Sequence, residues 1–221
     1  MKIRWLGHSC FQITNRAGTF HVLTDPFLAP LNPVAPIGVN EIDACDVVLL
    51  SHDHEDHIAH VEPVLRQTGA TLVAVHEHAV RFAALGLEAE GCNIGGELTV
   101  RGMKIFVANA IHSSAAAHEC GFIFEVDGLT LYFMGDTALF GDLALYRRFF
   151  SIDVVMVPIG DRYTMGPRFA AEAVRMLGAR VAIPMHYNTW PPIAQDPHDL
   201  ERHLAGAARV CALAPGGVYE A

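Results

Sequence analysis

Short apolar runs of strand length alternate with amphipathic segments along this chain. The run from Val47 to Leu50 is apolar at every position, which is typical of a strand covered on both faces. We expect strands at residues 2–6, 10–14, 19–24, 46–50, 71–75, 97–101, 104–111, 121–126, 129–133, 154–158, 180–184 and 209–213. We expect helices at residues 58–67, 77–85, 140–149, 167–177 and 197–206.

Strands are followed by helices twice in this order. The pattern predicts an α/β fold in which two mixed sheets stack face to face, with helices outside each, as a four-layer sandwich. The dipeptide Asp127-Gly128 predicts a tight hairpin between two of the strands. No low-complexity linker interrupts the pattern, so we predict a single domain over residues 1–221.

A cluster of metal-binding side chains follows the strand at residues 46–50. The stretch from Ser51 to His57 reads S-H-D-H-E-D-H, so three imidazoles and three carboxylates fall within six residues. Folding gains nothing from this crowding, because buried polar groups cost stability unless each has a partner. A metal ion supplies such partners, and the cluster therefore predicts a metal site.

Other candidate ligands occupy the ends of other expected strands. Asp25, His112, Asp136 and His186 each lie at or just beyond the carboxyl end of a strand. Side chains at strand ends of α/β folds converge on one rim, where ligands and chemistry collect. We expect these four residues to join the cluster at residues 51–57.

The bulk composition limits the partners and the setting. Fifteen Lys and Arg residues against 24 Asp and Glu give a formal charge of −9, which argues against nucleic acid as a partner. No apolar run approaches the roughly 20 residues of a membrane helix. The five cysteines are scattered and predict reduced thiols, hence a cytoplasmic protein. A chain that is 52% hydrophobic is also compatible with a homo-oligomer.

The string H-x-H-x-D-H, formed by His52, His54, Asp56 and His57, resembles the metallo-β-lactamase superfamily. His112, Asp136 and His186 follow in the order of that family, and the resemblance covers essentially the full chain. The stretches around residues 5–9, 135–140, 158–167 and 183–189 are similar to a bacterial and archaeal subfamily known only as metal-dependent hydrolases. The resemblance implies the αββα sandwich that the strand pattern predicts.

The resemblance also implies two divalent ions and a division of the ligands between them. His52, His54 and His112 would hold the first ion, Asp56, His57 and His186 the second, and Asp136 would bridge both. Imidazole and carboxylate ligands suit zinc first, and also manganese, iron and nickel. The implied function is hydrolysis of a small ester, lactone, phosphodiester or amide by a hydroxide that bridges the two metals.

Two other classes of function are also compatible with the string. Persulfide dioxygenases with one iron carry the same string, so a mononuclear iron oxidoreductase is an alternative. A metal-binding or ligand-binding module that has lost catalysis is another. His54 stands where the diiron flavoproteins of the superfamily have an acidic residue, which favours the hydrolases.

Several residues around the predicted ligands are candidates for supporting roles. Asp25 matches the first motif of the superfamily and would support a metal-binding histidine from behind; the alternative is a turn cap before Pro26. His8 follows the first strand and is a candidate proton donor, or else a core histidine. Asp53 and Glu55 are expected to be spacers that point away from the metals. Further candidates for substrate contacts or catalysis are Ser113, Asp161 and Asn188.

Overall fold

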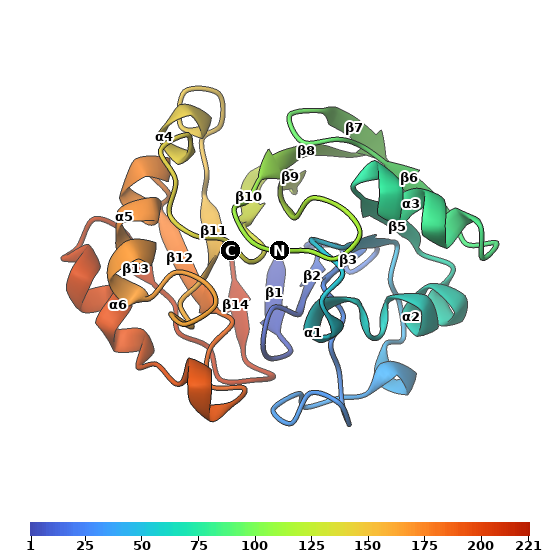
Figure 1. Ribbon diagram of the computed structural model, residues 1–221, viewed down its shortest axis with the longest axis horizontal. Coiled ribbons are helices and arrows are strands. Elements are labelled where there is room, and N and C mark those ends of the chain that lie inside the picture. Colours follow the sequence, from blue (N-terminus) through green and yellow to red (C-terminus); the bar gives the residue numbers. More distant parts are fainter.

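Two seven-stranded mixed β-sheets pack face to face in a computed structural model that describes residues 1–221 (Figure 1). The first sheet has the order β14 (Val218–Glu220), β1 (Lys2–Trp5), β2 (Phe11–Thr14), β3 (His21–Thr24), β4 (Val47–Leu49), β5 (Thr71–Ala74), β6 (Ala89–Gly91). The second sheet has the order β13 (Arg209–Val210), β12 (Val181–Met185), β11 (Val154–Pro158), β10 (Leu129–Phe133), β9 (Cys120–Val126), β8 (Met103–Asn109), β7 (Glu97–Val100).

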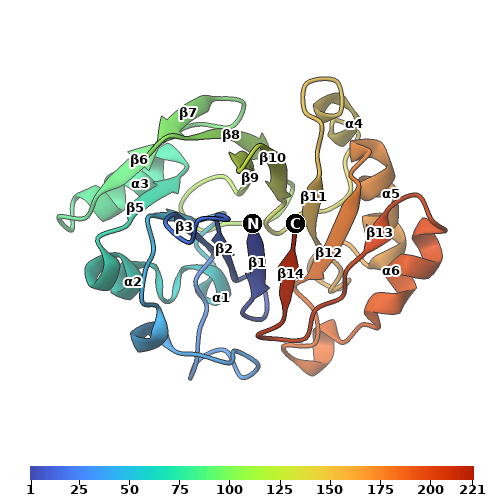
Figure 2. The ribbon, with the colours of Figure 1, turned by 180° about the vertical axis from the view of Figure 1, so that it is seen from behind.

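Helices form the outer layers on both sides of the paired sheets. On the side of the first sheet lie α1 (Glu55–Ile58), α2 (Val61–Thr68) and α3 (His76–Ala83). On the side of the second lie α4 (Leu143–Tyr146), α5 (Pro167–Leu177) and α6 (Pro197–Leu204), as the reverse view in Figure 2 also shows. This arrangement confirms the predicted four-layer αββα sandwich. None of these helices has the length and apolar character needed to cross a membrane.

The two sheets repeat one plan. Strands β3 to β6 run parallel in the first sheet, and β10 to β13 run parallel in the second. Antiparallel strands complete each sheet on its other side. Parallel strands end at one common edge, so β3, β4, β10, β11 and β12 all deliver the residues that follow them to the same rim of the sandwich.

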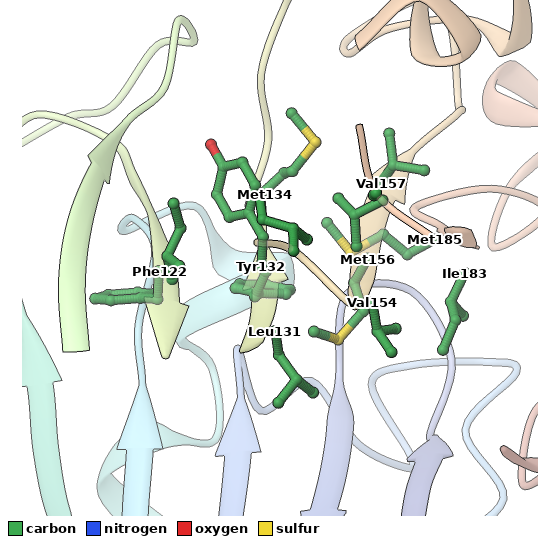
Figure 3. Close-up of a cluster of buried hydrophobic side chains, with 14 of the residues drawn as sticks. Phe122, Leu131, Tyr132, Met134, Val154, Met156, Val157, Ile183 and Met185 are labelled. Atoms are coloured by element: carbon green, nitrogen blue, oxygen red, sulfur yellow. The ribbon is translucent and has the colours of Figure 1, made fainter. Parts of the chain in front are cut away.

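The period of two in a strand divides the core into layers. In and just after β4, Val47 and Leu49 join the large cluster of buried side chains that the second sheet shares, whereas Val48 and Leu50 join the cluster beneath α2 and α3. Figure 3 shows Tyr132, Met156 and Met185 among the buried side chains of β10 to β12. Apolar packing on both faces of these strands fixes the position of their carboxyl ends.

Two predicted helices have different bounds in the structure. The helix expected at residues 58–67 is preceded by a separate turn, α1, and begins only at Val61. The helix expected at residues 140–149 is a single turn. From Leu145 to Phe149, hydrogen bonds of the 3₁₀ type, from an N–H to the carbonyl three residues earlier, replace the α-helical pattern. The predicted hairpin is confirmed, since Asp127 and Gly128 have φ of 54° and 76° as a two-residue turn requires.

The sequence pattern does not predict two of the short strands, β6 and β14. Strand β6 has the sequence Ala-Glu-Gly, and β14 has three residues after Gly216-Gly217, so neither carries a strand pattern of its own. Each forms because the backbone of a longer neighbour offers unpaired hydrogen-bonding groups, as β1 does to β14. The strand expected at residues 209–213 covers only 209–210.

Candidate metal centre

The two halves of the H-x-H-x-D-H string have different backbone conformations. Residues 52–54 lack helical structure, and His54 is extended with φ of −66° and ψ of 147°. The chain then turns into α1, where Asp56 and His57 are consecutive helical residues. Consecutive positions in a helix differ by about 100° in direction. The string therefore sends its first two histidines to one place and its last two residues to another.

The first place is a group of three ring nitrogens, which we call the tri-histidine group: His52, His54 and His112. The His54 Nδ1 atom lies 3.0 Å from His52 Nε2 and 3.3 Å from His112 Nε2. Ligand atoms of a tetrahedral zinc site, with Zn–N distances of about 2.0–2.1 Å, lie about 3.3–3.4 Å apart. The spacing of these nitrogens is thus close to that of three ligands of one ion.

The second place gathers Asp56, His57 and His186, which we call the mixed group. Asp56 carboxylate oxygens lie 4.0 Å from His57 Nε2 and 4.0 Å from His186 Nε2. His8 lies in the same cluster, with Nε2 3.1 Å from Asp56 Oδ2. One carboxylate, two ring nitrogens that face it and a third histidine therefore meet within a small volume.

Asp136 lies between the two groups. Its Oδ2 atom is 3.6 Å from His112 Nε2 in the tri-histidine group. The same oxygen is 2.9 Å from His186 Nε2 and 3.4 Å from His57 Nε2 in the mixed group. Gly135 makes this placement feasible: its φ is +62°, and a Cβ there would lie 2.7 Å from the Cys120 carbonyl oxygen.

Behind the ligand atoms, the buried carboxylate of Asp25 connects the two groups. Its Oδ2 atom lies 2.6 Å from His57 Nδ1 and 2.5 Å from Ser51 Oγ, and its Oδ1 accepts the Ser51 backbone N–H at 2.7 Å. Ser51 Oγ is in turn 2.9 Å from His52 Nδ1. In the arrangement in which all donors point toward Asp25, His52 and His57 each carry their proton on Nδ1 and turn a bare Nε2 toward the centre.

The electrostatics of the centre favour neutral imidazoles at His52 and His112. Burial lowers the pKa of His52 to about 2, and burial also lowers the pKa of His112. His57 differs: burial opposes its protonation, yet the carboxylates of Asp136 and Asp25 raise its pKa well above the usual value. Burial also opposes ionisation of Asp136, but His186 and His57 hold its pKa well below the usual range. Protons and a cation therefore compete at His57.

Buried polar atoms without partners provide a test of whether a metal fits here. His57 Nε2 and Asp136 Oδ1 are buried and have no hydrogen-bond partner. Such atoms cost stability unless something satisfies them. Both belong to residues of the candidate ligand set. His57 Nε2 lies 3.4 Å from Asp136 Oδ2, so a divalent cation between the two groups would satisfy that nitrogen. The donor set of five imidazoles and two carboxylates is also that of a zinc, iron or manganese site.

Comparison with known proteins gives the family. Residues 2–186 match the family model described as a beta-lactamase superfamily domain. The chain belongs to the beta-lactamase superfamily. A protein of Thermococcus kodakarensis named as a metal-dependent hydrolase is 42% identical over 228 residues, covering 100% of this chain and 99% of the relative. The expectation drawn from the H-x-H-x-D-H string is thus confirmed at the level of the family.

Two solved structures share the fold. A metallo hydrolase from the archaeon Ignicoccus hospitalis has a TM-score of 0.92 and 32% identity, covering 100% of this chain and 98% of its own. A diiron beta-hydroxylase from Streptomyces venezuelae has a TM-score of 0.77 at 14% identity, covering 100% of this chain and 54% of its own. The second likeness concerns the fold alone.

The acidic spacers of the superfamily string lie outside both ligand groups. Glu55 is exposed, and Asp53 turns to the loop after His112, where its Oδ1 accepts hydrogen bonds from Ser114 Oγ at 2.7 Å and from the Ala115 N–H at 2.9 Å. Glu119, which the sequence did not single out, is buried and accepts the His112 backbone N–H at 2.6 Å. Asp53 thus holds the middle of the loop that carries His112, and Glu119 closes the loop by its hydrogen bond to His112.

Other predicted candidates lie near the centre without joining it. Asn188 Oδ1 accepts the Gln195 N–H at 2.9 Å, Asp161 closes its own loop through backbone hydrogen bonds, and Ser113 is exposed. Five site candidates share one unusual feature, a positive φ in a residue other than glycine: His8, Asp25, Asp161, His186 and Asn188. Such conformations cluster at functional sites, where the surrounding structure maintains the strain.

One groove of this superfamily member lies away from the candidate metal centre. It has a volume of about 610 Å³ and runs over β7 to β10, next to the exposed Phe149. None of the candidate metal ligands lines it. Convergent titratable groups, rather than cavity size, mark the chemical site of this chain.

Proposed function

We propose that this chain is a hydrolase that uses two divalent cations, zinc first among them, to cleave a small ester, lactone, phosphodiester or amide. The observation that carries the proposal is the position of Asp136. One oxygen of that buried carboxylate lies within 3.6 Å of a histidine of the tri-histidine group and of both histidines of the mixed group. A carboxylate shared in this way is the arrangement expected between paired ions.

Each group of ligands has its own role in the proposed site. The tri-histidine group would hold one ion, the mixed group the other, and Asp136 both. Bound divalent cations supply Lewis acidity, which lowers the pKa of water and polarises the electrophilic centre of a substrate. Asp25 keeps a proton on His57 Nδ1 and, through Ser51, on His52 Nδ1, so that both Nε2 atoms stay free to bind a cation.

The exposure of the ligands indicates the side from which a substrate arrives. His52, His57, Asp136 and His186 have at most 3% of their side chains exposed, whereas Asp56 has 26% and His112 has 11%. The open side of the centre thus lies over Asp56 and His112. Trp190, which is 38% exposed, flanks this region with its ring 5.2 Å from that of His8. The site supports a small-molecule substrate with an apolar part beside the reacting group.

The proposal also covers the compartment and the partners of the protein. All five cysteines are free, which supports a reducing compartment such as the cytoplasm. We propose that the protein forms a homo-oligomer and binds neither nucleic acid nor membranes. A single-iron oxidoreductase has less support, because the mixed group is as complete as the tri-histidine group.

A metal-reconstitution assay tests the function. The purified chain is stripped with a chelator and then titrated with zinc, manganese, iron(II) or nickel, while hydrolysis of an ester, a lactone, a phosphodiester and an amide is followed. We expect hydrolysis of at least one substrate to be absent after stripping and to rise as the second equivalent of metal binds. The Glu55→Gln variant is the matched control, because Glu55 is an exposed carboxylate within the same string.

Two results would argue for the alternatives instead. Two bound ions without hydrolysis of any substrate class would indicate a binding module. One bound iron, together with oxygen consumption in the presence of glutathione persulfide, would indicate the oxidoreductase.

A further inference from the structure

His8 is a fully buried histidine whose contacts join the two halves of the sandwich. It follows β1 with a φ of 55°, and its side chain is 0% exposed. Its backbone carbonyl oxygen accepts the N–H of His186 at 2.9 Å. Its ring reaches Asp56 Oδ2 through Nε2 at 3.1 Å and Thr189 Oγ1 through Nδ1 at 2.8 Å. His8 thus contacts two members of the mixed group from two different sheets.

Hydrogen-bonding capacity sets the direction of these contacts. An ionised carboxylate only accepts, so the proton between His8 and Asp56 belongs to His8 Nε2. In the neutral imidazole, His8 Nδ1 is then an acceptor, and the Thr189 hydroxyl donates to it. Both ring nitrogens are therefore engaged by the protein. Thr189 holds the ring, and the ring holds one oxygen of Asp56.

Aromatic packing encloses this chain of hydrogen bonds. The ring of Phe27, which is buried, lies 5.7 Å from the His8 ring at a steep angle, and the ring of Trp190 lies at 5.2 Å. Water has little access to the side of His8 that faces these rings, and hydrogen bonds that are shielded from water are stronger. The Asp56 side chain, by contrast, is partly exposed and needs an external partner to fix its direction.

We propose that His8 is a positioning residue for the mixed group, which orients Asp56 toward a bound cation and is itself oriented by Thr189. The proposal rests on the proposed function, because it concerns the second of the two ions. It assigns a role to Thr189 and gives His8 a different role from that of a proton donor. In this arrangement, Asp56 keeps its other oxygen, Oδ1, free to face His57 and a cation.

The experiment measures cation affinity rather than turnover. Chelator-stripped wild type, His8→Ala, His8→Gln and Thr189→Val are titrated with zinc alone in a calorimeter, and the two equivalents are fitted separately. We expect His8→Ala to lower the affinity for the second equivalent of zinc by about 10- to 100-fold and to leave the affinity for the first unchanged. This is the usual effect of removing a partner that orients a metal ligand. His8→Gln keeps a donor that reaches Asp56, so we expect it to restore most of the affinity.

Thr189→Val is the second variant, because it replaces one hydroxyl by a methyl group and leaves His8 in place. We expect it to lower the affinity for the second equivalent of zinc less than His8→Ala does, and to leave the affinity for the first unchanged. The absorption spectrum of the cobalt-loaded protein adds a readout of the ligands themselves. We expect the His8→Gln spectrum to match that of wild type, since a positioning residue does not bind the ion.

The outcomes separate this inference from the proposed function. Unchanged affinity for the second equivalent in His8→Ala, with two ions bound to wild type, overturns the role of His8 alone. A cobalt spectrum that changes in His8→Gln shows that His8 is itself a ligand and also overturns it. A wild-type chain that binds one ion overturns the proposed function, and the inference with it.

Discussion

Replacement of Asp136 by alanine is expected to lower kcat/KM for hydrolysis by about 10³-fold or more, because the change removes the carboxylate that would contact both of the proposed ions. The Asp136 carboxylate is buried, and its Oδ2 lies 2.9 Å from His186 and 3.6 Å from His112. We also expect metal analysis of the variant to give fewer than two tightly bound ions. The measurement is steady-state hydrolysis at saturating metal, paired with elemental analysis of the same sample.

The matched control for this change is Asp142→Asn, on an exposed aspartate whose side chain makes no capping hydrogen bond. Its activity and metal content should equal those of wild type. An Asp136→Ala protein that binds two ions and hydrolyses within tenfold of wild type would show that Asp136 is not shared between the ions.

Replacement of Asp25 by alanine should affect both proposed ions at once, because Asp25 contacts His57 directly and His52 through Ser51. The change removes the acceptor of His57 Nδ1 at 2.6 Å and of Ser51 Oγ at 2.5 Å. We expect both zinc affinities to fall by about 10- to 100-fold. Because a buried ionic hydrogen-bond partner is lost, the free energy of unfolding should fall by about 3–5 kcal/mol. Zinc titration and urea unfolding of the stripped protein measure the two effects.

Ser51→Ala provides the comparison, because it breaks only the branch that leads to His52. We expect it to lower the zinc affinity of the tri-histidine group by about tenfold and to leave that of the mixed group unchanged. If Asp25→Ala and Ser51→Ala weakened the same single site, Asp25 would not orient both groups, and the link between them through Ser51 would be wrong.

The fold could be predicted from the sequence wherever a pattern repeats within one element. The apolar run at Val47–Leu50 predicts a strand buried on both faces, and its residues do divide between two layers of the core. The strands β6 and β14 have three residues each and form because a neighbouring strand pairs with them. Their formation depends on tertiary structure, which a local pattern does not contain.

The candidate site shows a similar division. The dense string at residues 52–57 and the strand-end positions of His112, Asp136 and His186 can be read from the sequence, because crowded polar groups beside a buried strand cost stability unless each has a partner. The contact of Thr189 with His8 spans 181 positions, and that of Ser51 with Asp25 spans 26. Neither Ser51 nor Thr189 differs in sequence from an ordinary turn residue, so only the assembled fold reveals their partners.

The proposed function requires two ions, one on either side of Asp136. The most direct measurement is a crystal structure of the zinc-loaded chain, with anomalous scattering recorded on both sides of the zinc absorption edge. We predict two zinc peaks about 3.5–4 Å apart, one against His52, His54 and His112, and the other against Asp56, His57 and His186. A single fully occupied peak, or two peaks that Asp136 does not contact, would contradict a pair of ions shared by Asp136.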